Sequence, residues 1–108
     1  MTVSPGDLWV AAIPFTDGSA TKRRPALVLW VDGPDVVVAA VTSAQPRSAT
    51  DIALLDWQTS GLRVPSTVRL SRLDCLEKSL LVVRLGRIST GDAASVKMAW
   101  SKEVRLSF

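Results

Sequence analysis

Apolar residues in this chain fall into short runs separated by polar turns, a pattern typical of a mainly β protein. The run over residues 36–42 is apolar at nearly every position, which predicts a strand buried on both faces. The Asp32-Gly33-Pro34-Asp35 turn before it predicts an antiparallel hairpin with the preceding run. The expected strands cover residues 7–13, 26–31, 36–42, 51–55, 66–70 and 80–85.

A single helix is expected after the last strand. Ser89 precedes Asp92 by three positions, a variant of the capping box in which Asp replaces Glu or Gln. Apolar residues then recur at roughly helical spacing, at Ala93, Val96, Trp100 and Val104. The predicted fold class is mainly β (α+β), a small, strongly curved sheet or barrel of antiparallel strands with a C-terminal helix.

Length and composition favour one domain over residues 1–108, large enough for a core without disulfides. The net charge of +3 permits nucleic-acid binding and does not require it. No apolar run approaches the roughly 20 residues of a membrane span, and no signal peptide is expected at the N-terminus. The single cysteine, Cys75, fits a reducing cytoplasm, and we expect it to be buried as a small hydrophobe.

The chain contains no histidine and no tyrosine. Histidine-based catalysis, a Ser-His-Asp triad and a histidine metal site are therefore excluded. One cysteine without histidine also excludes a structural zinc site. We expect no metal and no cofactor, so any chemistry falls to Arg, Lys, Asp, Glu, Ser, Thr or Cys.

A polar loop leads into the second apolar run through three consecutive cations, Lys22, Arg23 and Arg24. Pro25 fixes its own φ and restricts Arg24 at the junction of loop and strand. A guanidinium held in this way suits a phosphate, because its planar fork can bind two oxygens. The alternative is a solvated turn whose charges keep the strand end soluble.

Further cations lie at Arg63, Arg69 and Arg72 and at Arg84 and Arg87. If they converge in space with the first group, they form a polyanion-binding surface. Scattered solubilising charge is the alternative.

Four of the six aromatic residues are tryptophans. We expect Trp9, Trp30 and Trp100 in the core, because they fall in strand or helix patterns. Trp57 falls in a polar loop, where it could contact RNA or a partner.

Several motifs occur in a fixed order along the chain, beginning with Gly6-Asp7-Leu8-Trp9 and the Thr16-x-Gly18-Ser19 loop. The cations and Arg24-Pro25 follow, and then an apolar strand that ends in Thr42-Ser43. Further matching blocks are Gly61-Leu62, Ser66 to Leu70, Leu76-Glu77-Lys78 and Leu85 to Ile88. As an ordered set, these motifs resemble the MazF/PemK toxin family.

The resemblance implies an SH3-like barrel that forms a homodimer. It also implies a metal-independent endoribonuclease toxin that cuts single-stranded RNA in the cytoplasm. Such a toxin pairs with a MazE-like antitoxin, a separate small protein whose tail covers the RNA groove.

Carried over to this chain, the resemblance assigns catalysis to Arg24 and Thr42. Arg24 would clamp the phosphorane formed when a 2′-OH attacks the adjacent phosphate, and Thr42 would hydrogen-bond a non-bridging oxygen. The expected RNA-contacting residues are Ser19, Lys22, Arg23, Ser43, Arg69 and Ser71.

The chain departs from the family pattern at three positions. Ser71 replaces a carboxylate that some members place two residues after Arg69. Ser19 stands where some members have a histidine, and Ala20 replaces the usual acidic residue. The general base is therefore open, with candidates by residue type at Asp17, Asp74 and Glu77.

Two other functions remain open from the sequence. One is a non-catalytic toxin of the same fold that resembles CcdB and inhibits DNA gyrase. The other is a catalytically silent module that binds RNA or its antitoxin.

Overall fold

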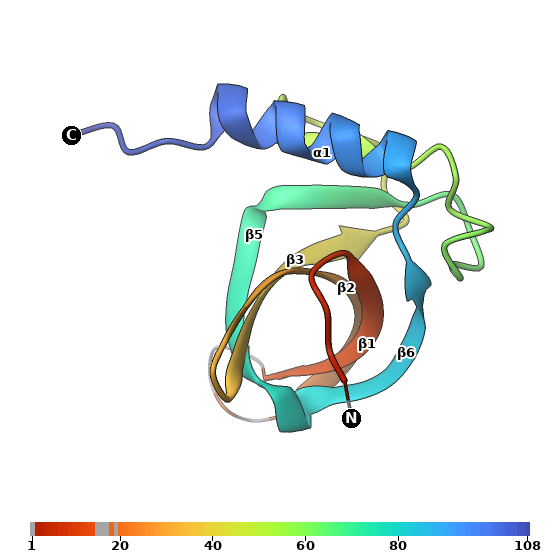
Figure 1. Ribbon diagram of the computed structural model, residues 1–108, viewed down its shortest axis with the longest axis vertical. Coiled ribbons are helices and arrows are strands. Elements are labelled where there is room, and N and C mark those ends of the chain that lie inside the picture. Colours follow the sequence, from red (N-terminus) through yellow and green to blue (C-terminus); the bar gives the residue numbers. More distant parts are fainter. Residues whose placement is uncertain (1, 15–17, 19) are drawn as a thin grey trace.

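The computed structural model describes residues 2–14, 18 and 20–108, which form one antiparallel sheet and a C-terminal helix (Figure 1). A short 3-10 turn, η1 (Lys78–Leu80), connects the last two strands. The strands are β1 (Asp7–Pro14), β2 (Thr21–Asp32), β3 (Asp35–Thr42), β4 (Asp51–Ala53), β5 (Thr67–Glu77) and β6 (Leu81–Arg87), and the helix is α1 (Thr90–Glu103). The predicted mainly β class is confirmed.

Each predicted strand is present, but the bounds of all six differ from those expected, most of all in β2 and β5. β2 begins at Thr21, five residues before the predicted start, because its first part pairs with β1. β5 continues past Leu70 to Glu77, and β4 ends at Ala53. Pro25 therefore lies inside β2, where β1 pairs with it and the pairing with β3 has not yet begun.

The strands follow the order β4-β5-β3-β2-β1-β6, and the sheet curves strongly around itself (Figure 1). The expected barrel does not close. Within the described residues, β4 and β6 are the edge strands, and they do not pair with each other. The gap is filled by backbone packing, since Ser60 and Gly61 of the loop after β4 lie directly against Leu85 and Gly86 of β6. A Cβ atom on either glycine would overlap a carbonyl oxygen of the other segment.

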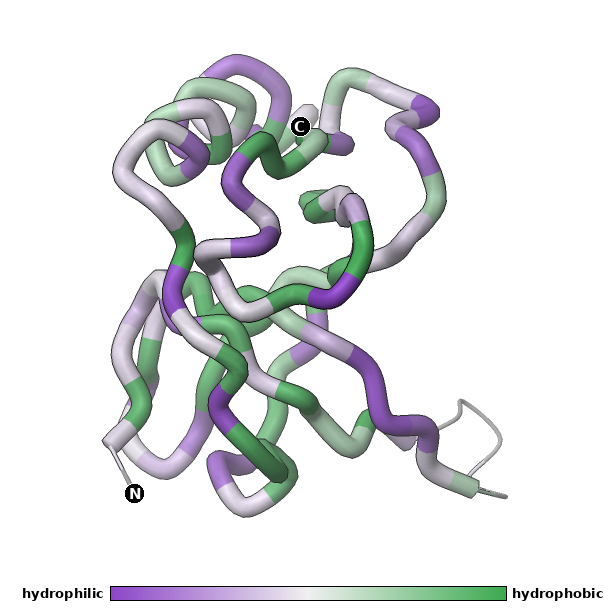
Figure 2. Tube along the Cα trace, turned by 90° about the vertical axis from the view of Figure 1, so that its right-hand side faces the viewer, coloured by the Kyte–Doolittle hydropathy of each residue, from purple (hydrophilic) through white to green (hydrophobic). Residues whose placement is uncertain are grey.

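Both faces of the sheet carry a hydrophobic cluster. Figure 2 shows several hydrophobic stretches along the strands of the curved sheet. One cluster includes Leu27, Val41 and Val68 and receives Val96 from α1. The other includes Trp9, Val28, Val38 and Leu76 on the opposite face. The prediction that strand 36–42 is buried on both sides is confirmed, because no residue of β3 is exposed.

The helix begins as predicted, with the Ser89 hydroxyl accepting a hydrogen bond of 3.1 Å from the Asp92 amide. The Asp92 carboxylate does not complete the capping box. It accepts hydrogen bonds of 3.0 and 2.9 Å from the amides of Leu55 and Asp56 and so ties the loop after β4 to α1. The apolar stripe of α1 packs on the sheet through Val96 and Trp100.

Two predictions of core positions are wrong. Trp30 is 44% exposed, because it follows an irregularity in the β2–β3 pairing. Its ring contacts Trp100 edge-to-face, with the ring centroids 6.0 Å apart. Cys75 is exposed, because it falls on the outward-facing positions of β5. Trp9 is buried as expected, and Trp57 packs partly against the core.

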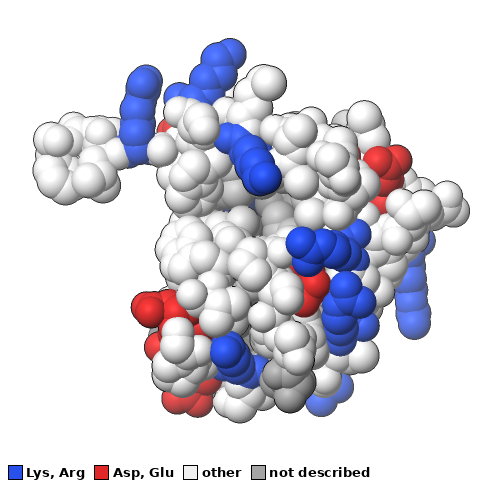
Figure 3. Space-filling model, in the orientation of Figure 1, with Lys and Arg blue, Asp and Glu red and all other residues white. Residues whose placement is uncertain are grey.

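Asp7 joins the ends of β1 and β6. Its buried carboxylate accepts hydrogen bonds from the Ser4 amide at 2.9 Å and the Trp9 indole at 3.4 Å, and it lies 3.3 Å from both Arg84 and Arg87. Basic side chains surround an acidic one over β6 in Figure 3. Burial alone would raise the pKa of Asp7, but the hydrogen bonds from Ser4 and Trp9 and the charge of Arg84 outweigh burial and lower it.

Asp7→Asn is expected to lower the free energy of unfolding at pH 7 by about 1–3 kcal/mol, because hydrogen-bond donors lose a charged acceptor. A carboxyl group with a lowered pKa in the folded state stabilises the protein above its unfolded pKa. That contribution is lost as pH falls through the folded value. Urea unfolding at several pH values should therefore show the two proteins converging below about pH 4. Asp32→Asn, at an exposed turn, is the control, and a constant gap between Asp7→Asn and the unsubstituted protein at all pH values would contradict the assignment.

Gly61→Ala is expected to destabilise the protein by at least about 2 kcal/mol, because Gly61 has φ +93° and its added Cβ would overlap the Leu85 carbonyl. Gly91→Ala is the matched control, since an added Cβ there meets nothing within 4 Å. Thermal unfolding measures both variants. Equal melting temperatures would show that the contact between the loop and β6 does not hold the open sheet together.

Candidate active site

A cavity of about 350 Å³ opens where β1, β2, β3 and β5 come together. Its lining contains four cations, one hydroxyl and one carboxylate among apolar residues. The lining residues are Ile13, Pro14, Lys22, Arg24, Ala40, Val41, Thr42, Arg69, Arg72 and Asp74. This cavity brings together Arg24, Thr42, Lys22 and Arg69, which the sequence assigned to one site.

Strand register explains why Arg24 and Thr42 meet. Ala26 of β2 pairs with Ala40 of β3, and this is the last pair before the strands diverge toward the cavity. Continuing that register by two residues leads to Arg24 on one strand and Thr42 on the other. Because residues two apart in a strand share a face, both side chains project from the same side of the sheet.

Thr42 is oriented by the turn that follows β3. Its Oγ1 accepts a hydrogen bond of 3.2 Å from the Ala44 amide. A hydroxyl group has one hydrogen to donate besides its acceptor sites. The Thr42 hydroxyl hydrogen therefore stays available for an oxygen atom bound in the cavity.

Asp51 of β4 orients the Arg69 side chain. The Nε of Arg69 lies 3.4 Å from Oδ1 of Asp51, whose side chain is 2% exposed and also accepts from the Arg47 amide at 3.0 Å. This contact uses Nε and leaves the two Nη groups of the guanidinium for another partner. Arg69 is thus an oriented cation at the cavity wall.

A large irregularity in β5 adds two residues to the cavity. Ala39 of β3 pairs with Leu73, whereas its neighbour Ala40 pairs with Arg69, so residues 70–72 are inserted between consecutive pairs. The strand bends sharply near its middle (Figure 1). Arg72 and Asp74 consequently line the same cavity as Arg69. The sequence offered Asp74 as a candidate base and Arg72 as a candidate cation by residue type alone, because the alternation of residues does not reveal an insertion of this size.

Several predicted site residues lie outside this cavity, and two others lie outside the described residues. Arg23 pairs with Ala12, so its side chain projects from the face opposite to its neighbours Lys22 and Arg24. Ser43 and Ser71 are exposed and do not line the cavity. Ser19 lies outside the described residues, as does Asp17. Glu77 is at the far end of β5, paired with Asp35.

The predicted convergence of cations is confirmed in part. Lys22, Arg24, Arg69 and Arg72 gather at one cavity, whereas Arg84 and Arg87 converge on Asp7. Figure 2 shows the hydrophilic start of β2, which supplies two of the four. Four cations around one concave surface attract a polyanion, and the guanidinium groups suit phosphate oxygens.

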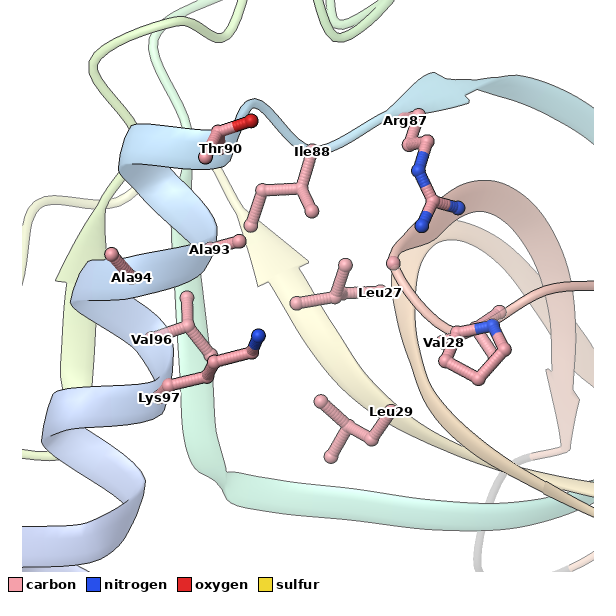
Figure 4. Close-up of a pocket in the computed structure, with 12 residues that line it drawn as sticks. Leu27, Val28, Leu29, Arg87, Ile88, Thr90, Ala93, Ala94, Val96 and Lys97 are labelled. Atoms are coloured by element: carbon pink, nitrogen blue, oxygen red, sulfur yellow. The ribbon is translucent and has the colours of Figure 1, made fainter.

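A larger cavity of about 510 Å³ lies between α1 and the sheet. Figure 4 shows Leu27 and Leu29 of β2 facing Ile88 and Val96 across it, with Arg87 and Lys97 at its edges. Its lining is mostly aliphatic and contains no carboxylate. The smaller cavity is therefore the candidate active site, because it alone of the two combines several guanidinium groups with a carboxylate.

Within the described part of the chain, no group of three metal-ligating side chains occurs. None of its helices is long and apolar enough to span a membrane.

Comparison with solved structures shows the same fold in several proteins. The chain is similar to an endoribonuclease in complex with its cognate antitoxin from Mycobacterial species, with a TM-score of 0.78, 15% identity, and 99% of each chain covered. It is similar to Mycobacterium tuberculosis toxin MazF-mt6, with a TM-score of 0.70, 21% identity, and 86% of this chain and 90% of that one covered. It is also similar to MazE-MazF from Deinococcus radiodurans, with a TM-score of 0.67, 20% identity, and coverage of 98% and 97%.

None of the curated proteins compared with the chain matches it. A family model described as PemK-like, MazF-like toxin of type II toxin–antitoxin system matches residues 4–102. That match spans nearly the whole sheet and α1, and it contains every described residue of the candidate active site. The chain therefore belongs to the PemK-like, MazF-like family of toxins of type II toxin–antitoxin systems.

Proposed function

We propose that this protein is an endoribonuclease toxin that cleaves single-stranded RNA without a metal ion. The observation that carries the proposal is the cavity in which Arg24, Thr42, Arg69 and Lys22 converge. Family membership and the fold shared with an endoribonuclease support the same function. We further propose that cleavage is sequence-specific and inhibits growth.

RNA carries its own nucleophile, because the 2′-OH lies next to the scissile phosphate. Attack on phosphorus forms a cyclic phosphate and releases a 5′-OH. The protein has to hold the reacting atoms in line and stabilise the negative charge that develops on the phosphorane. Arg24 binds two non-bridging oxygens, and the free hydrogen of Thr42 donates to one of them.

The other cations of the cavity act on the backbone of the RNA. Arg69, oriented by Asp51, and Lys22 bind phosphates flanking the one that reacts. Arg72 extends the same surface along β5. Contacts of this kind position RNA, and sequence selection comes from contacts to the bases.

For partners we propose a MazE-like antitoxin and a second copy of this chain, with the toxin acting in the cytoplasm. Two of the similar structures carry a cognate antitoxin or MazE in their names. An antitoxin segment with acidic side chains would complement the four cations of the cavity and compete with RNA for them.

Arg24→Ala is expected to reduce cleavage of a long single-stranded RNA by about 10²–10³-fold or more, because it removes the main positive charge that stabilises the phosphorane. The assay is run in excess chelator, with cut sites mapped by primer extension. Arg23→Ala is the matched control, since it removes a neighbouring cation from the opposite face of the strand. It should retain most of the activity.

Full activity of Arg24→Ala would overturn the proposed site. Intact RNA at high protein concentration, combined with inhibition of DNA gyrase, would establish the CcdB-like alternative. RNA binding without products would establish a silent binding module.

A further inference from the structure

We propose that Asp74 is the general base of the RNA cleavage, accepting the proton of the attacking 2′-OH. The inference rests on the proposed function and names a residue for a step that Arg24 and Thr42 do not perform. Asp74 is the carboxylate in the lining of the candidate active site.

The inserted residues of β5 place Asp74 there. Asp74 pairs with Val38 of β3, and Arg69 pairs with Ala40. Val38 and Ala40 are two residues apart in a regular strand and share a face, so their partners share it as well. Arg69 and Asp74 are five residues apart, and an uninterrupted strand would have sent them to opposite faces.

Two other carboxylates, one on β4 and one on β5, make contacts outside the cavity. Asp51 is almost fully buried and is occupied by Arg69 and the Arg47 amide. Glu77 lies at the opposite end of β5, where it accepts a hydrogen bond from Ser79. Asp74, in contrast, makes no hydrogen bond or ion pair with another described residue, and it lines the cavity.

The charged groups that line the cavity with Asp74 come from two of the four strands around it. Lys22 and Arg24 come from β2, and Arg69 and Arg72 come from β5. β1 contributes Ile13 and Pro14, and β3 contributes Ala40, Val41 and Thr42, none of which is ionisable. A base at Asp74 would therefore act beside the cations that are proposed to hold the phosphates.

The proposed step balances as follows. The 2′-oxygen forms a bond to phosphorus while its proton passes to a carboxylate oxygen of Asp74. The bond between phosphorus and the 5′-oxygen breaks, and that oxygen takes a proton from water. The products are a 2′,3′-cyclic phosphate and a 5′-OH, and Asp74 then returns its proton to solvent.

The test is the single-turnover cleavage rate of Asp74→Asn on a short single-stranded RNA that contains a mapped cut site. The expected result is a loss of about 10²-fold or more, the usual contribution of a general base. Glu77→Gln is the matched control, because it removes a carboxylate from the same strand outside the cavity. It should cleave at the unsubstituted rate, and Asp74→Glu should restore part of the lost activity.

Two further measurements separate proton transfer from a structural or binding role. The rate of the unsubstituted protein should fall toward acid pH as the base becomes protonated, and Asp74→Asn should lose this acidic limb. Binding of the same RNA carrying a 2′-deoxy residue at the cut site should be unchanged or tighter in Asp74→Asn, because a negative charge is removed. Asp74→Ser is the second variant if Asp74→Asn does not fold, as judged by thermal unfolding.

An unchanged rate and pH profile in Asp74→Asn, in a series where Arg24→Ala is inactive, would overturn Asp74 as the base and leave the proposed function standing. So would loss of activity in Asp17→Asn with full activity in Asp74→Asn. Absence of cleavage by the unsubstituted protein would overturn both proposals.

Discussion

The pairing of β5 with β3 is the constraint on which the site depends. β5 pairs with β3 on both sides of three inserted residues and also carries β4. The insertion bends the strand, so one continuous element serves two parts of a curved sheet (Figure 1). It also resets which face each later residue occupies. Arg69 and Asp74 consequently share a cavity with Arg24 and Thr42.

The curved sheet is stabilised by several contacts that do not involve the charged residues of this cavity. Hydrophobic clusters cover both of its faces, and a loop fills the gap between its unpaired edges through Gly61 and Gly86. Asp7 and Asp92 use buried carboxylates to join elements far apart in the sequence. The cations of the cavity therefore project from strands that these other contacts hold in place. This arrangement suits a site that has to be preorganised for a phosphate.

Much of the fold could be predicted because apolar runs and capping residues are local signals. The helix from Thr90, the hairpin at Asp32–Asp35 and the two-sided burial of β3 all follow from residues close together in the chain. The site could be predicted only in part. Arg24 and Thr42 were identified by resemblance, and the structure adds their common cavity with Arg72 and Asp74. The exposure of Trp30 and Cys75 was missed because it depends on strand irregularities and on register with neighbouring strands.

The sequence by itself determined the strands and the helix cap, the chemistry excluded by the lack of histidine, and the family pattern. Each of these depends only on residue types and on their order over short stretches. Only the tertiary structure decided which cations lie together. Lys22 and Arg24 project from one face of β2 and Arg23 from the other. Arg84 and Arg87 form ion pairs with Asp7 and do not line the cavity. The physical reason is that strand register assigns faces, and register is set by pairing between distant segments. The same reason places Asp74, five residues after Arg69, beside it.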